Sequence, residues 1–157
     1  MSIRVKDVMV KNIITIGAMS TVRRAVELMG KYEIGCLIVV HKDKPVGIVT
    51  ERDVLTRVLL ELRDPRKTRV RSIMSKPLIT ANPETNIHEA MSLMVKRKIK
   101  KLPVIKRGRL HGLVTLTDVV RSSAYFEHVI SSFIQRKCAK CKWRQPKRET
   151  VVLQSSV

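Results

Sequence analysis

Apolar and polar positions follow the same order twice along the chain. Apolar residues three and four apart predict helices at 22–29 and 87–94. Short runs rich in β-branched residues predict strands, which lie at 13–16, 37–40 and 47–49 and again at 78–81, 104–105 and 113–114. The turn-forming stretches HKDKP and KRGR join the last two strands of each half, and a further helix follows each half's last strand. The pattern predicts a mixed α/β (α+β) fold made of two β-α-β-β-α units.

The two units are copies of one another. Moving the sequence by 65 positions places residues 5–55 on residues 70–120 without a gap, with seventeen identical pairs among fifty-one. Most of the other pairs exchange one aliphatic residue for another. Because one such unit cannot enclose its own hydrophobic face, we expect the two copies to pack together with pseudo-twofold symmetry. This packing would create two equivalent clefts between them.

The boundaries of the copies follow from the same comparison. We expect a first repeat over residues 1–61, a polar linker over 62–69 and a second repeat over 70–127. Residues 128–157 would form a helix extension and a basic tail. Apolar residues at helical spacing continue past the repeat at Phe126, Ile130 and Phe133, where they either cover the module's own core or pack against a second copy. We favour the second alternative and expect a homodimer.

A short motif ends the strand region of each repeat: GIVTERD at residues 47–53 and GLVTLTD at 112–118. Thr and Asp three residues apart at a helix start predict a capping box, which stabilises a helix by about 1 kcal/mol. A helix N-terminus also attracts anions, and a neighbouring carboxylate accepts hydrogen bonds from ribose hydroxyls in dinucleotide-binding folds. The motif is therefore compatible with a helix cap alone and with a nucleotide site.

The doubled motif, the openings VKDVM and VRSIM, and the stretch KLPVI together resemble a tandem CBS (cystathionine-β-synthase) domain pair, or Bateman module. The resemblance covers residues 5–120. It implies two β-α-β-β-α repeats with pseudo-twofold symmetry, usually assembled as dimers. It also implies a regulatory function without catalysis: the module would bind AMP, ADP or ATP, or less readily S-adenosylmethionine, and signal to a regulated protein by conformational change.

The resemblance implies two sets of nucleotide-binding residues, each combining one repeat's motif with strand starts of the other. In the first cleft Asp53 would bind the ribose, and the other residues would be Thr50, Arg52, Ile79, Thr80, Ala81, Lys101 and Leu102. In the second cleft Asp118 would bind the ribose, and the other residues would be Thr115, Thr117, Ile14, Thr15, Ile16, Cys36 and Leu37. Lys100 and Lys101 stand where the first repeat has Gly35 and Cys36, so we expect the Asp53 cleft to be more cationic and to prefer more phosphates.

The charge of the chain suggests a second function. Thirty-two Lys and Arg residues against thirteen Asp and Glu give a net charge of +19, which favours anionic partners. The stretches 96–109 and 136–148 are rich in Lys and Arg and contain no Asp or Glu. The second also contains Trp143, which could stack on a base. The alternative function is therefore a nucleic-acid-binding protein that uses its basic surface and tail on a CBS scaffold. Such binding would depend steeply on salt.

The cysteines allow one further interpretation. Cys138 and Cys141 have the C-x-x-C spacing of a zinc knuckle, but a structural zinc site needs four ligands, so two chains would have to share one ion. The pair could equally be redox-capable or without a role, and we expect no cofactor to be required. Cys36 is expected to be a small buried apolar residue.

Other classes of protein are disfavoured. The sequence contains neither a P-loop nor a recognisable nucleophile–base arrangement, so we do not expect an enzyme. It has no apolar run of about 20 residues, as a membrane span would need. Charges near residue 1 argue against a signal peptide, and three cysteines form no disulfide framework. We therefore expect a cytoplasmic protein that does not bind membranes.

Overall fold

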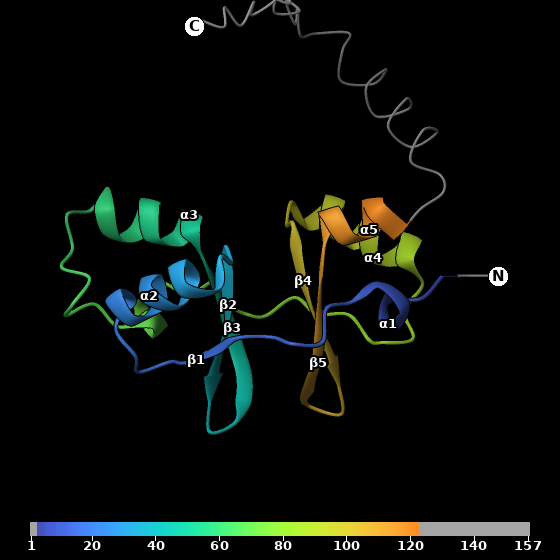
Figure 1. The fold of residues 1–157 in the computed structure, drawn as a ribbon, viewed down its shortest axis with the longest axis horizontal. Coiled ribbons are helices and arrows are strands. Elements are labelled where there is room, and N and C mark those ends of the chain that lie inside the picture. The colour runs from blue at the N-terminus through green and yellow to red at the C-terminus, as the bar shows by residue number, and fades with distance from the viewer. Residues whose placement is uncertain (1–2, 123–157) are drawn as a thin grey trace, which may run out of the picture. The chain divides into compact units, whose positions relative to one another are not determined.

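The computed structural model describes residues 3–122, and the secondary structure follows the predicted order (Figure 1). The elements of the first half are α1 (Val5–Val8), β1 (Thr15–Gly17), α2 (Val22–Tyr32), β2 (Cys36–His41), β3 (Lys44–Thr50), α3 (Glu51–Val54) and the π-helical turn η1 (Leu55–Leu59). Those of the second half are the 3₁₀ turn η2 (Val70–Ser72), α4 (Ile87–Arg97), β4 (Lys101–Lys106), β5 (Arg109–Thr115) and α5 (Leu116–Ser122). The helix extension and tail predicted for 128–157 lie outside the described residues.

The strands form one small sheet in each half. In the first, β1 runs parallel to β2 and β2 runs antiparallel to β3. In the second, β4 and β5 are antiparallel, and Ala81 forms a single parallel bridge to Val104 where Ile16 pairs with Val39 in the first half. The strand predicted at 78–81 is thus reduced to one bridge in the second half. Mixed helices and small sheets confirm the predicted fold class.

Both hairpins turn in the same way. Lys42 and Asp43 have φ of 50° and 60°, and Arg107 and Gly108 have φ of 51° and 75°. Two consecutive residues with positive φ are the mark of a type I′ turn, whose twist matches that of the flanking strands. Both hairpins also contain an irregularity in register at the same place, between Val39 and Val40 and at the matching position of the second half.

The long helices also match. Thr21 caps α2 by accepting a hydrogen bond from the Arg24 N–H (3.3 Å), and Asn86 caps α4 by accepting from the His88 N–H (2.8 Å). Each helix ends at a residue in the left-handed conformation, Glu33 or its counterpart in the second half. Their buried faces carry the apolar residues predicted from spacing: Val22, Ala25 and Met29 in α2, and Ile87, Ala90 and Met94 in α4.

The opening segment of each repeat packs on the hydrophobic core of the other repeat. Val5 is fully buried in the cluster formed by α4, β4 and β5, and Val70 and Ile73 are fully buried in the cluster formed by α2, β2 and β3. Backbone hydrogen bonds hold both segments, from the Val5 N–H to Thr85 O (2.9 Å) and from the Val70 N–H to Ser20 O (2.9 Å). Because of this exchange, the two repeats belong to one unit, Met1–Ser122.

Candidate functional site

Both Thr–Asp motifs form capping boxes. Asp53 Oδ2 accepts hydrogen bonds from the Thr50 backbone N–H (2.8 Å) and from Thr50 Oγ1 (2.8 Å), and the Asp53 N–H donates to Thr50 Oγ1 (3.3 Å). Thr115 and Asp118 make the same three bonds, at 2.9, 2.7 and 3.3 Å. The capping interpretation of the motif therefore holds at both positions. It uses only one carboxylate oxygen of each Asp.

The second carboxylate oxygen distinguishes the two motifs. Asp53 Oδ1 accepts a hydrogen bond from Ser75 Oγ (3.3 Å) and forms an ion pair with Arg57 (3.3 Å), and Asp53 is only 7% exposed. Asp118 Oδ1 has no hydrogen-bond or ion-pair partner among residues 3–122, and Asp118 is half-buried in the wall of a cavity. Only the second motif therefore offers an acceptor oxygen to a ligand.

The cavity beside Asp118 has a volume of about 230 Å³ and is lined by both repeats. Thr115 and Asp118 contribute its polar side. Its apolar side comes from Ile14, Ile38 and Leu113, among others. Main-chain bonds in both directions between Val10 and Leu113 (2.9 Å each) fix the segment before β1 against β5. The cavity thus joins a carboxylate from one repeat to an apolar surface made largely by the other.

A lysine enters this cavity from β4. The Lys101 ammonium donates a hydrogen bond to Gly35 O (2.6 Å) and lines the cavity with Asp118. A Cβ atom on Gly35 would lie 2.8 Å from Glu51 Oε2 and 3.0 Å from Lys101 Nζ, so only glycine leaves room for both side chains beside this position. We expected Lys101 to serve the Asp53 cleft, but its charge reaches the Asp118 cavity.

Cys36 lies in the same cavity wall and is 7% exposed. Burial raises the pKa of its thiol above the ordinary value, although the neighbouring Lys101 ammonium acts in the opposite direction. The thiol is therefore neutral near pH 7. This agrees with its interpretation as a small apolar residue.

The other residues implied by the resemblance are distributed between cores and surfaces. Ile16, Leu37, Ala81 and Leu102 are buried in the two cores, so their side chains are committed to packing. Half-buried positions are occupied by Ile79 and Thr80, and exposed positions by Thr15, Arg52 and Thr117. Of the residues expected in the second cleft, the cavity brings together Ile14, Cys36, Thr115 and Asp118.

Sequence reasoning missed the reason for the glycine in each motif. A Cβ atom on Gly112 would lie 2.5 Å from the sulfur of Met9, and a Cβ atom on Gly47 would lie 2.7 Å from the sulfur of Met74. The methionine that ends each opening segment therefore packs directly on the glycine of the other repeat's motif. The two openings VKDVM and VRSIM and the two motifs were visible in the sequence, but only the fold shows that each opening packs on the motif of the other repeat.

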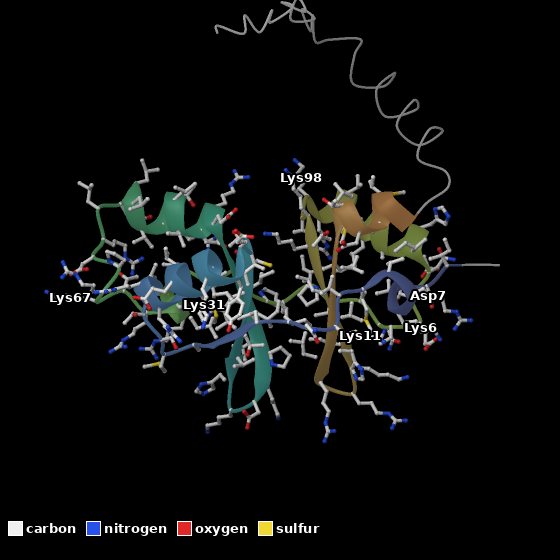
Figure 2. All side chains as sticks on the ribbon, viewed as in Figure 1. Lys6, Asp7, Lys11, Lys31, Lys67 and Lys98 are labelled. Atoms are coloured by element: carbon white, nitrogen blue, oxygen red, sulfur yellow. The ribbon has the colours of Figure 1, made fainter. Side chains whose placement is uncertain are left out.

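Residues outside the cavity add little to the other interpretations. Seven of the eight basic residues between 96 and 109 are exposed, including Lys98, as a solvated basic face would be (Figure 2). Within residues 3–122 there is no group of three His, Cys, Asp or Glu side chains that could hold a metal ion. The same part of the chain also lacks a helix long and apolar enough to cross a membrane. Cys138, Cys141 and the basic tail lie outside the described residues.

Known proteins are similar to this chain in sequence and in fold. A family model of the CBS domain matches the chain twice, over residues 5–60 and 70–125. The mitochondrial CBS domain-containing protein CBSX3 of Arabidopsis thaliana is 39% identical over 113 residues, 69% of this chain, and the chain spans about half of that relative (54%).

Two solved structures have the same arrangement. A CBS-domain protein of Burkholderia ambifaria, assigned provisionally to signal transduction, is 38% identical with a TM-score of 0.68, covering 71% of this chain and 82% of that one. A hexameric CBS-CP12 protein from bloom-forming cyanobacteria is 30% identical with a TM-score of 0.74, covering 89% of this chain and 90% of that one. With two matched repeats and this fold, the chain belongs to the CBS-domain family.

Proposed function

We propose that the protein is a non-catalytic regulatory module that binds an adenine nucleotide in the cavity beside Asp118. The observation that carries the proposal is the free oxygen Oδ1 of Asp118, which lies in a cavity with an apolar wall and a lysine. A carboxylate oxygen accepts hydrogen bonds from ribose hydroxyls, while an apolar wall suits a base. Lys101 and Thr115 would then meet the phosphates.

The size of the cavity supports this orientation. Its 230 Å³ is below the roughly 300–1,000 Å³ of typical ligand pockets. The nucleoside would therefore fill the cavity, and the phosphates would lie at its mouth. A chain with a net charge of +19 favours AMP, ADP or ATP over S-adenosylmethionine, which carries a positive charge.

The Asp53 motif is the weaker candidate. Its carboxylate already bonds to Thr50, Ser75 and Arg57, so a ribose would have to replace protein partners. We propose that the Asp118 cavity is filled first. Ligand binding at Asp53 would require the segment that carries Ser75 to move.

Regulation would follow because residues of both repeats line the cavity. Because both repeats contribute to it, a nucleotide would favour one arrangement of the repeats over another if it binds them unequally. The provisional assignment of the Burkholderia relative to signal transduction supports such a role. The regulated protein would recognise the arrangement that the nucleotide stabilises.

We also propose that the protein is a homodimer or a larger homo-oligomer. Leucines at the end of the first repeat and the start of the linker are strongly exposed, with values of 57% for Leu55, 56% for Leu59, 78% for Leu60 and 93% for Leu62. Apolar side chains gathered over so short a stretch are typical of a protein–protein contact. The hexameric relative supports self-association.

Titration calorimetry with AMP, ADP, ATP and S-adenosylmethionine would test the nucleotide proposal. We expect at least one adenine nucleotide to bind the wild type, Asp118→Ala to abolish binding and Asp53→Ala to retain it. Thermal unfolding provides a second readout, since a ligand at 100 times its Kd stabilises by about 2.7 kcal/mol. Loss of binding in Asp53→Ala with retention in Asp118→Ala would place the ligand in the Asp53 cleft, contrary to the proposal. Failure of all four ligands to bind the wild type would refute the proposal.

A further inference from the structure

A second hollow lies away from the Asp118 cavity and has a different chemistry. It has a volume of about 560 Å³, with Ala18, Val46 and Met74 among its lining residues. Basic groups also line it: His41 from the end of β2, Arg71 from η2, and Lys76. We call it the η2 groove. It shares no lining residue with the Asp118 cavity.

The walls of the η2 groove are held by main-chain bonds. The Arg71 N–H donates to Ala18 O (3.0 Å), and the Ala18 N–H donates to Val40 O (2.9 Å). Ser75 and Ile48 exchange two further bonds, at 2.8 and 3.1 Å. The positions from which the basic side chains project are therefore fixed before any ligand arrives.

The matching place in the second half contains an acid beside its cations. Lys6 and Lys11 stand there at the positions of Arg71 and Lys76, and Figure 2 labels both. Glu84 forms ion pairs with Lys6 (2.9 Å) and with Arg4. Hydrogen bonds from Lys6 and Arg4 lower the pKa of the Glu84 carboxyl. The second half thus supplies an anion to Lys6, the counterpart of Arg71, while Lys11 has no ion pair among the described residues.

The η2 groove lacks this anion. The position of Glu84 is taken by Met19, which is 50% exposed, and the position of Asp7 by Ser72. Among the described residues, no carboxylate lies within ion-pair distance of Arg71, Lys76 or His41. The first half therefore has basic groups at these matching positions but neutral residues where the second half has Glu84 and Asp7.

We propose that the η2 groove binds a small organic phosphate, with its apolar body on Ala18, Val46 and Met74 and its phosphate between Arg71 and Lys76. A phosphate accepts charge-assisted hydrogen bonds from both cations, and an apolar body removes the floor of the groove from water. This site is separate from the nucleotide cavity. It does not depend on the function proposed for that cavity.

The test introduces at position 19 the glutamate that the second half has at the matching position, Glu84. In Met19→Glu, the carboxylate would take the position of Glu84 and pair with Arg71, the counterpart of Lys6, whereas Met19→Gln has nearly the same shape without the charge. The probe is 1-naphthyl phosphate, with 1-naphthol and inorganic phosphate as its two separate halves. Amide chemical shifts of the ¹⁵N-labelled full chain would report the position and affinity of binding.

We expect 1-naphthyl phosphate to shift the amides of Ala18, Arg71 and Met74 and to bind more tightly than either half. Met19→Glu should weaken binding by up to about fivefold, as one competing ion pair at an exposed position can, while Met19→Gln should leave the affinity close to that of the wild type. Arg71→Gln, which removes one cation at an exposed position, should also weaken it. Asp118→Ala should have no effect.

Three results would overturn the proposal. Equal binding of 1-naphthol would show that the cations are not used, and equal binding of inorganic phosphate would show that the apolar floor is not used. Unchanged affinity in both Met19→Glu and Arg71→Gln would show that the probe binds elsewhere. Thermal unfolding of each variant would confirm that it is folded.

Discussion

Replacing Asp53 should destabilise the protein more than replacing Asp118, although the two residues are equivalent in the repeat. Both substitutions to Ala remove a capping box, which costs about 1 kcal/mol. Asp118→Ala removes only that box, because within residues 3–122 all the hydrogen bonds of the Asp118 carboxylate are to Thr115. Its expected effect is therefore a loss of about 1 kcal/mol in the free energy of unfolding.

Asp53→Ala loses more. The hydrogen bond from Ser75 adds about 0.5–1.5 kcal/mol. The ion pair with Arg57, whose side chain is 43% exposed, adds about 0.2–1 kcal/mol after screening by solvent. The total is about 1.7–3.5 kcal/mol, so the two variants should differ by about 0.7–2.5 kcal/mol.

Equilibrium unfolding in urea without nucleotide would measure the difference, and the slope of the transition should be the same for all variants. Thr50→Ala and Thr115→Ala are matched controls, because they remove only what the two capping boxes share and should have similar effects. Equal losses in Asp53→Ala and Asp118→Ala, or a greater loss in Asp118→Ala, would refute the assignment of Asp53 to structure and of Asp118 to binding.

Three further predictions follow from contacts elsewhere. Gly47→Ala places a Cβ atom 2.7 Å from the Met74 sulfur and 3.1 Å from a backbone oxygen, so it should lower the free energy of unfolding by about 1–3 kcal/mol, and Met74→Ala in the same chain should recover part of that loss in urea unfolding. Burial raises the pKa of Cys36, so the unfolded chain loses this proton first as pH rises above about 8.5. The stability of the wild type relative to Cys36→Ala should accordingly be constant below that pH and fall above it, as unfolding measured from pH 7 to 10 would show; a rise would contradict the buried, neutral thiol. Replacing the exposed Leu59 and Leu60 by Gln should shift the protein towards monomer in sedimentation velocity without lowering its thermal stability, and an unchanged oligomer would place the contact elsewhere.

Much of the fold was predictable because its signals are local. The apolar spacing of Val22, Ala25 and Met29 fixes which face of α2 is buried, and that face depends only on the period of the helix. The turns at residues 42–43 and 107–108 and the capping boxes at the two motifs depend on neighbours within a few residues. Duplication then repeated each of these signals, which is why the two halves agree in detail.

The exchange of opening segments was not predictable in this way. Val5 packs on the second core and Val70 on the first, and nothing in the local pattern indicates which of two similar cores an apolar segment will join. Periodicity shows that a face is buried but not what buries it. The contact of Met9 with Gly112 depends on the same long-range choice.

In the candidate site, too, some features follow from local sequence and others from long-range packing. The sequence by itself determined the duplicated α+β repeat and identified Thr50, Asp53, Thr115 and Asp118 as the residues of interest, because repetition and capping are properties of short stretches of chain. Only the tertiary structure decided between the two aspartates. Asp53 meets Ser75, which is distant in sequence and lies in the exchanged segment, whereas the corresponding oxygen of Asp118 faces a cavity. Which polar groups remain available to a ligand depends on every element packed around them, and spacing along the chain does not contain that information.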